Sequence, residues 1–208
     1  MKRKNFFFGF SLLEVMVSLA VVSIGALGYV KSQVTTLKNV SDIMARTVAN
    51  TLLEDMASRM QANPAEVWLG SGSAYLTTGA LVSGVYTAGA YTTACNGGTT
   101  ICTAAQMASN DLKEWTALVA SSFPAAMAAE TRICLESTPG TYNLSNAACG
   151  TATNSYPLVF TIKIYWKSSQ NSGAFDQAAV TTVEAPLARI PTFPLPGPSA
   201  STGSGQYK

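Results

Sequence analysis

A nearly uncharged stretch close to the start of the chain limits its possible folds most. Residues 6–30 contain one charged side chain, Glu14. An α-helix rises 1.5 Å per residue, so about 20 residues cross the ~30 Å hydrocarbon core of a bilayer. The stretch therefore predicts a membrane-spanning helix. The basic residues Lys2, Arg3 and Lys4 predict that the short N-terminal end stays in the cytoplasm.

Two simpler interpretations of this stretch compete. A secretory signal peptide has an apolar core of about 7–15 residues, followed by small residues at a cleavage site. Here the apolar stretch is longer and runs without a break into a helix with a polar face. A plain signal anchor is the second interpretation, and only Glu14 argues against it.

Glu14 needs a physical reason to lie in an apolar span. A carboxylate there costs about 2.5–3.5 kcal/mol on insertion scales. One reason is local, because Ser11 and Glu14 have the S-x-x-E spacing of a capping box. The other is functional: the carboxylate meets a positive charge once several copies assemble.

The residues around Glu14 carry a resemblance to a known family. Residues 9–14 (GFSLLE), with a basic leader before them and an apolar helix after them, resemble the processing motif of type IV prepilins. In that family an inner-membrane peptidase cuts after the glycine and methylates the new N-terminal phenylalanine. The resemblance implies a leader of residues 1–9, cleavage between Gly9 and Phe10, and N-methylation of Phe10. Glu14 then becomes the fifth residue of the mature chain.

Elementary electrostatics favours this role for Glu14. Cleavage would expose an α-amine whose unperturbed pKa is near 8, so the amine is largely cationic at neutral pH. In a filament core of low dielectric constant, the amine of one subunit can neutralise Glu14 of the next. Burying the two charges as a hydrogen-bonded pair costs much less than burying either alone. Such pairing would favour a fixed axial step between subunits.

The helical pattern continues beyond the membrane segment with an apolar stripe. Its members recur every three or four residues: Leu37, Val40, Met44, Val48, Leu52, Met56 and Met60. Asp42 with Arg46, and Asp55 with Arg59, have the spacing of surface ion pairs. Pro64 is expected to stop the helix.

A helix over residues 10–63 would be about 80 Å long. A head domain of the remaining size cannot cover all of it. Residues 10–30 therefore need lipid or other helices, whereas residues 31–63 form an amphipathic continuation that a head over residues 64–189 can cover. Residues 190–208 are rich in Pro, Gly and Ser and are expected to form a flexible tail.

Within the head, the sequence predicts an α+β fold. Residues 67–110 carry no charge and are expected to be mostly loop, with a short strand or hairpin near residues 80–86. A second helix should begin at Thr103, where Thr103 and Gln106 have capping-box spacing, and end before Pro124. Strands are expected at 132–136, 158–167 and 179–185, forming an antiparallel sheet with one face on the long helix. Residues 158–167 alternate well between apolar and other side chains.

Four cysteines follow the membrane segment: Cys95, Cys102, Cys134 and Cys149. An even number beyond such a segment predicts disulfides in an oxidising compartment. A zinc site is the competing interpretation, but the chain has neither a C-x-x-C pair nor a histidine. Three connectivities are possible, and the bonds Cys95–Cys102 and Cys134–Cys149 are favoured because each joins near neighbours and would pin a loop.

Further segments narrow the resemblance. Residues 46–50 (RTVAN), 53–64 (LEDMASRMQANP), 102–107 (CTAAQM), 111–115 (DLKEW) and 132–135 (RICL) are similar to minor pilins called type IV pilus modification protein PilV. This likeness implies a non-catalytic subunit that helps to prime or cap a type IV pilus and so supports adhesion or twitching motility. Implied partners are prepilin peptidase and other minor and major pilins. The implied location is the inner membrane, with a periplasmic head, and then the cell-surface pilus.

The composition excludes several other function classes. Without histidine there is no Ser-His or Cys-His nucleophile, and no P-loop, dinucleotide fingerprint or metal-ligand cluster is present, so no cofactor and no enzymatic activity are expected. A Ser-Lys arrangement stays open. Beyond the three early basic residues, ten basic and eleven acidic residues remain, so nucleic-acid binding is not expected.

Alternatives to a minor pilin are a minor pseudopilin of type II secretion, a tip-displayed adhesin or other binding module, and an anchored periplasmic protein that never assembles.

Overall fold

The computed structural model describes residues 11–77, 82–86, 95, 102–136, 144, 149–150, 157–169, 171 and 173–185. The helices are α1 (Leu12–Ala62), α2 (Pro64–Val67) and α3 (Ala104–Ser122), with short 3-10 turns at Gly70–Gly72 and Ala125–Met127. The strands are β1 (Val82–Ser83), β2 (Glu130–Leu135), β3 (Val159–Trp166) and β4 (Gln177–Glu184). The α+β fold is confirmed. The expected leader at 1–9 and tail at 190–208 lie outside the described residues.

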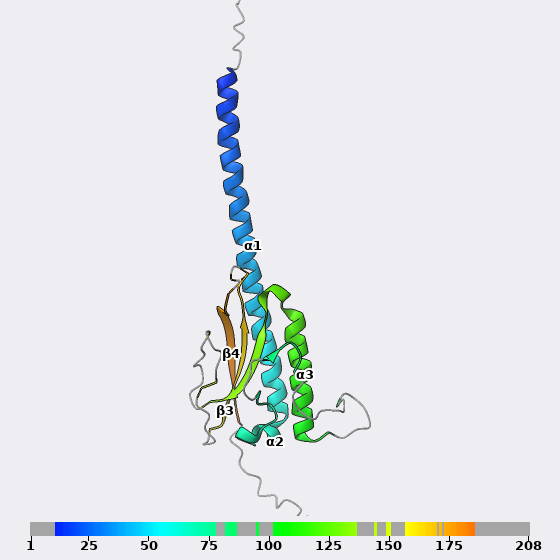
Figure 1. Cartoon of the computed structure of the whole chain (residues 1–208). Coiled ribbons are helices and arrows are strands. Elements are labelled where there is room, and N and C mark those ends of the chain that lie inside the picture. The colour runs from blue at the N-terminus through cyan, green and yellow to red at the C-terminus, as the bar shows by residue number, and fades with distance from the viewer. Residues whose placement is uncertain are drawn as a thin grey trace, which may run out of the picture.

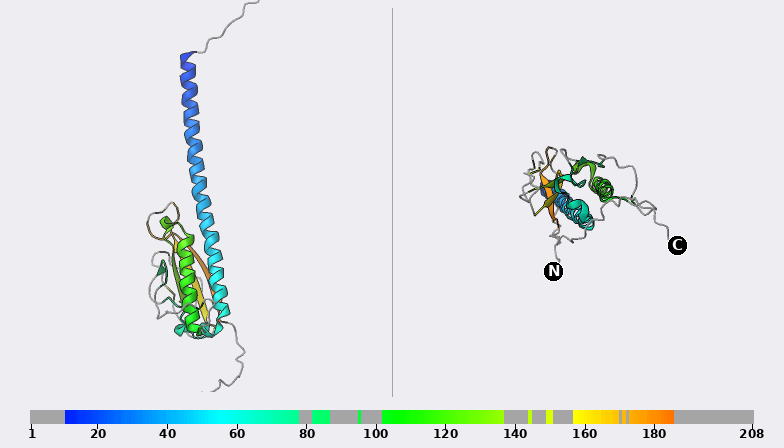
Figure 2. Two further views of the ribbon diagram at one scale, coloured as in Figure 1. Left: turned by 90° about the vertical axis from the view of Figure 1, so that its right-hand side faces the viewer. Right: turned by 90° about the horizontal axis from the view of Figure 1, so that it is seen from below.

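Helix α1 is 51 residues long, or about 75 Å. Its first half projects from the head, and its second half packs against β3, β4 and α3, as both side views show (Figures 1 and 2). The expected long helix is confirmed over the described residues. Pro64 does not simply end helical structure: it is the first residue of α2, where a backbone N–H is not needed.

The expected capping box at the start of α1 is wrong. Ser11 has the extended backbone of an N-cap residue, but its side chain makes no capping hydrogen bond. The backbone carbonyl of Ser11 accepts from the N–H groups of Glu14 and Val15 at 3.0 and 3.3 Å. Capping therefore gives no local reason for the carboxylate of Glu14.

The apolar stripe of α1 is covered only in its second half. The buried residues of the helix are Ala45, Ala49, Leu52, Leu53, Met56 and Met60. Leu37 and Met44, which belong to the same predicted stripe, are 69% and 63% exposed. The head thus covers α1 only from about Ala45 onward, and the stripe continues past its edge.

Three charged residues of α1, Asp42, Arg46 and Arg59, reach other parts of the head. Asp55 and Arg59 form the expected ion pair at 3.0 Å. The expected Asp42–Arg46 pair is wrong, because Asp42 accepts a hydrogen bond from Ser169 N at 2.9 Å and Arg46 donates to the side chain of Gln177 in β4. A helical ion pair contributes only about 0.2–0.5 kcal/mol, so tertiary partners readily replace it.

The sheet has the order β1-β2-β3-β4 and is antiparallel throughout. The three expected strands are confirmed, with ends shifted by at most two residues at the described positions. The short strand expected near residues 80–86 is β1, which pairs with β2 through Val82 and Thr131.

One face of β3 packs against the helices and forms the core. Phe160, Ile162, Ile164 and Trp166 point into it and are fully buried. The alternate residues of β3, including Thr161, Lys163 and Tyr165, are also buried. The sequence predicted that one face lies on the long helix, but it did not predict that the opposite face is buried as well.

Helix α3 begins as expected. The Thr103 hydroxyl accepts from the Gln106 N–H at 3.3 Å, and the Gln106 side chain accepts from the Thr103 N–H at 2.9 Å. Both halves of the capping box are therefore formed. The helix ends at Ser122, before Pro124.

Candidate assembly surface

Glu14 lies in the first turn of α1, where a carboxylate favourably faces the positive end of the helix dipole. It lines a shallow hollow with Val15, Ser18, Leu19 and Val22. In the described part of the chain its carboxylate has neither a hydrogen bond nor an ion pair. Glu14 is thus an exposed charge on a helix surface that is otherwise uncharged as far as Val30.

Residues 12–40, the projecting half of α1, are all exposed to solvent. By length and composition α1 can cross a membrane, and none of its most apolar window is buried in the head. A signal sequence also has this length and apolarity, so these two properties do not distinguish a membrane anchor from a signal sequence. The exposed apolar side chains of this half include Leu12, Leu13, Met16, Leu19, Val22, Ile24 and Leu27.

A second apolar feature lies where α1 enters the head. A groove of about 330 Å³ is lined by Leu37, Val40, Ser41, Met44, Ala45 and Val48 of α1 and by Ser122, Phe123, Pro124 and Met127 beside the end of α3. None of these ten residues is charged. We call this feature the Met127 groove. It explains the exposed part of the α1 stripe, because Leu37 and Met44 form one wall of the groove.

The expected processing residues Gly9 and Phe10 lie outside the described residues. The structure therefore places Glu14 but not the atoms at which the chain would be cut and methylated. These two positions stay predictions.

Both disulfides favoured by sequence spacing are present. The Cα atoms of Cys95 and Cys102 are 5.9 Å apart, and those of Cys134 and Cys149 are 5.6 Å apart. Cys102 immediately precedes the N-cap of α3, whereas Cys134 lies in β2. Each bond thus ties a connecting segment to a regular element.

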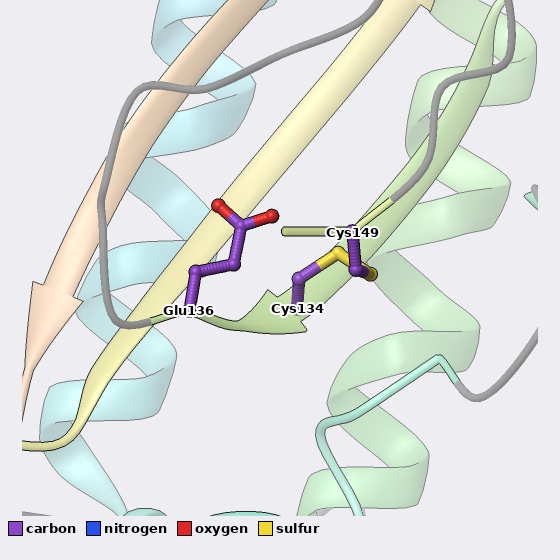
Figure 3. A group of neighbouring side chains, drawn as sticks. All are labelled: Cys134, Glu136 and Cys149. Atoms are coloured by element: carbon purple, nitrogen blue, oxygen red, sulfur yellow. A yellow bond between two sulfur atoms is a disulfide. The ribbon is translucent and has the colours of Figure 1, made fainter. Parts of the chain in front are cut away.

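One group of side chains has the composition of a metal site. Cys134, Glu136 and Cys149 place their ligand atoms within 4.8 Å of one another (Figure 3). Metal coordination by cysteine needs thiolates, but these two sulfur atoms are bonded to each other. The carboxylate of Glu136 is paired with Lys163. These donors therefore do not fit a metal ion in the oxidised protein.

A cluster that sequence reasoning missed joins α1, α3 and the segment before β1. Arg59 of α1 approaches Asp111 at 3.4 Å and Glu114 at 3.1 Å, and the Tyr75 hydroxyl donates to Asp111 at 2.8 Å. Burial raises the pKa of the Asp111 carboxyl, although the hydroxyl of Tyr75 and the charge of Arg59 oppose the rise. The only sequence signal was the Asp55–Arg59 spacing, which does not reveal partners on α3.

Comparison with known proteins finds a family match at the start of the chain. Residues 6–30 match the family described as Prokaryotic N-terminal methylation motif, the signal of type IV pilin-like prepilins. The matched segment contains Gly9, Phe10 and Glu14. No curated protein and no solved structure matches the chain. The motif supports a type IV pilin-like protein of a pilus or pseudopilus, a class of structural subunits that prepilin peptidase processes and that assemble with other pilins.

Proposed function

We propose that this chain is a minor pilin, a non-catalytic subunit that enters a type IV pilus after its leader is removed. The observation that carries the proposal is the exposed carboxylate of Glu14 on an apolar helix, inside a segment that matches a methylation motif. Cleavage falls between Gly9 and Phe10, and Phe10 is N-methylated. In the mature chain, residues 10–30 lie first in the inner membrane and then in the filament core.

The exposed first half of α1 supports a move of this helix from the lipid bilayer into the filament. The apolar residues of its first half have no cover in the head. Lipid covers them before assembly, with the head in the periplasm, and helices of neighbouring subunits cover them afterwards. The apolar helix also fits the single-pass anchor of a prepilin.

Glu14 supports assembly over simple anchoring. Lipid offers a carboxylate no counter-charge, so Glu14 is costly in a helix that only anchors. A neighbouring subunit whose N-terminus has been cut at Phe10 offers a cationic amine. The pair then lies in a medium of low dielectric constant, where an unpaired charge is strongly unfavourable. A processed subunit, which has the free amine at Phe10, therefore packs against Glu14 of its neighbour at a lower free-energy cost than an unprocessed one.

The Met127 groove supports a second contact between subunits. It extends the apolar surface of α1 onto the head, beyond the segment that lipid covers. Its uncharged lining matches the uncharged surface that α1 itself presents over most of its first half. We assign the groove to contact with a neighbouring pilin.

The narrower assignment to a PilV-like minor pilin rests on the sequence segments of the long helix and the head. Two of these segments meet in space, because Arg59 of residues 53–64 contacts Asp111 and Glu114 of residues 111–115. A minor pseudopilin of type II secretion is the alternative, since it would share the N-terminal motif. Genetic complementation of pilus and secretion mutants separates the two.

Mass spectrometry of the N-terminus in the assembled particle tests the proposal. We expect a methylated Phe10 as the first residue. An intact Met1, or cleavage after a small residue near position 30, would contradict it.

A further inference from the structure

A fully buried ion pair lies on the face of the sheet that does not pack on α1. Lys163, in the middle of β3, pairs through its Nζ with Oε1 of Glu136, which directly follows β2. Neither side chain has any exposed surface. The pair takes no part in the proposed assembly contacts, because it belongs neither to the surroundings of Glu14 nor to the lining of the Met127 groove.

The two buried charges of this pair need compensation from neighbouring groups. A buried charge is costly unless a partner and further hydrogen bonds compensate it. Across the sheet, Lys163 is directly opposite Arg132, a residue of the same sign. Like charges in this position are unfavourable. The carboxylate of Glu136 is therefore central to keeping Lys163 inside the head.

Gly150 holds that carboxylate in place from the other side. Its backbone N–H donates to the same Oε1 at 2.7 Å. The two residues are in close contact, because a Cβ at Gly150 would lie 3.6 Å from the Glu136 carboxyl group. A single oxygen thus receives both the ammonium of Lys163 and the amide of Gly150.

The disulfide fixes the position of Gly150. Cys149 precedes Gly150, and its bond partner Cys134 lies two residues before Glu136. Figure 3 shows Glu136 beside the bonded sulfur atoms. The backbone joins Cys134 to Glu136 through Leu135, and it joins Cys149 directly to Gly150. Together with the disulfide and the hydrogen bond from Gly150 to Glu136, these segments form a small ring that includes the Glu136 carboxylate.

We propose that the Cys134–Cys149 disulfide is a redox-sensitive clamp on the Glu136–Lys163 pair. Reduction by a dithiol transfers two electrons and two protons, giving two thiols in the head and a disulfide in the reductant. Gly150 is then released from Glu136, and water reaches the ion pair. The core face of the sheet stays packed on α1 and α3, because the side chains of Cys134, Glu136 and Cys149 do not belong to the apolar core, which Leu135 enters from the opposite face of β2. The outer face opens while the rest of the head stays folded.

Acetylation of lysines in the full chain, purified in detergent with both disulfides formed, tests the clamp. The label is an N-hydroxysuccinimide ester of acetate, and peptide mass spectrometry reads the rate at each lysine. Lys113 on the exposed face of α3 serves as the internal reference. In the oxidised protein we expect Lys163 to react at least about tenfold more slowly than Lys113. In the double variant with Cys134→Ser and Cys149→Ser, the two rates should come within about threefold of each other.

The second disulfide provides the matched control. The double variant with Cys95→Ser and Cys102→Ser also loses one bond, but neither residue lies in the ring around Glu136. Lys163 should stay protected in that variant. Equal protection of Lys163 with and without Cys134–Cys149 would overturn the proposal, as would equal exposure in both serine variants. Global unfolding, detected as exposure of the buried tryptophans by fluorescence, would also overturn it, because the clamp confines opening to the outer face.

A variant without the charges gives an independent check. Combining Glu136→Leu with Lys163→Met replaces the pair by apolar side chains, so exposing this region to water no longer releases two buried charges. The fall in Tm on removing Cys134–Cys149 should then be smaller than in the parent chain. If the two sets of substitutions are additive in Tm, the disulfide and the pair are not coupled and the clamp is wrong.

Discussion

Trp115 of α3 donates its indole Nε1–H to the backbone carbonyl of Leu52 in α1, at 2.7 Å. Both residues are buried, so this hydrogen bond joins the two long helices inside the core. Trp166 of β3 offers a natural comparison. It is equally buried, but its indole nitrogen has no hydrogen-bond partner among the described residues.

We therefore expect Trp115→Phe to destabilise the head more than Trp166→Phe. Both substitutions remove similar apolar volume, but only the first removes a buried hydrogen bond, which is worth about 1–3 kcal/mol when its partner is left behind. Denaturant unfolding of both variants measures the difference. Equal losses of stability would show that the Trp115–Leu52 contact adds nothing beyond packing.

Tyr165 gives a prediction for alkaline pH. Burial raises the pKa of its hydroxyl to about 12, compared with an ordinary value near 10. Between these two values the unfolded chain loses this proton while the folded chain keeps it, so stability falls as pH rises. We expect the free energy of unfolding to drop from pH 9 to pH 11 in the parent chain.

Tyr165→Phe should reduce that alkaline drop. Within the described part of the chain the hydroxyl of Tyr165 has no hydrogen-bond partner, so its removal leaves no polar group there unpaired. Burial also raises the pKa of Tyr75, which keeps part of the pH dependence in the variant. Urea unfolding at pH 9 and pH 11 measures the free energy of unfolding of both proteins. An equal drop between the two pH values in the parent chain and in the variant would contradict the role of Tyr165.

Glu14 should matter for assembly but not for processing. We expect Glu14→Gln and Glu14→Ala to be cut and methylated at Phe10, because both keep the Gly9–Phe10 junction. Both should enter pili at least about tenfold less well, since the amine of a neighbouring subunit loses its counter-charge. Immunoblots of sheared pili and of membranes measure incorporation. Glu14→Asp, which keeps the charge at the same position, serves as the control, and wild-type incorporation of Glu14→Gln would remove the pairing role.

The Met127 groove can be tested without disturbing the core. Met44 is largely exposed, so Met44→Glu should leave the Tm of the head nearly unchanged. A charge in the apolar groove should nevertheless lower incorporation into pili, because a neighbouring subunit would have to bury it. Asn50→Glu adds the same charge at another exposed position of α1, outside the groove, and should have little effect. Equal effects of both substitutions would mean that the groove is not a contact.

Features that depend on nearby residues were predictable from the sequence. The start of α3 depends on Thr103 and Gln106, three residues apart, and both hydrogen bonds form there. The alternation in residues 158–167 correctly predicted β3. Spacing also favoured the two disulfides, since each joins cysteines close in the chain.

Features that depend on distant residues were not predictable in the same way. Periodicity placed Met44 and Met56 on one stripe, but only the position of the head shows that Met56 is buried and Met44 is not. Ser11 and Glu14 have capping-box spacing, yet the side-chain bond does not form. The alternation in residues 158–167 puts Lys163 on the face away from the long helix, and it predicted neither the burial of Lys163 nor its ion pair with Glu136.

The continuity of α1 has a mechanical consequence. The helix runs from Leu12 to Ala62 as one element, so a pull on its projecting half passes into the head without an intervening loop. The load first meets the polar contacts of Asp42 with Ser169 and of Arg46 with Gln177. Tension on the anchored end would therefore be shared with β4 before it reaches the Trp115–Leu52 hydrogen bond deeper in the head.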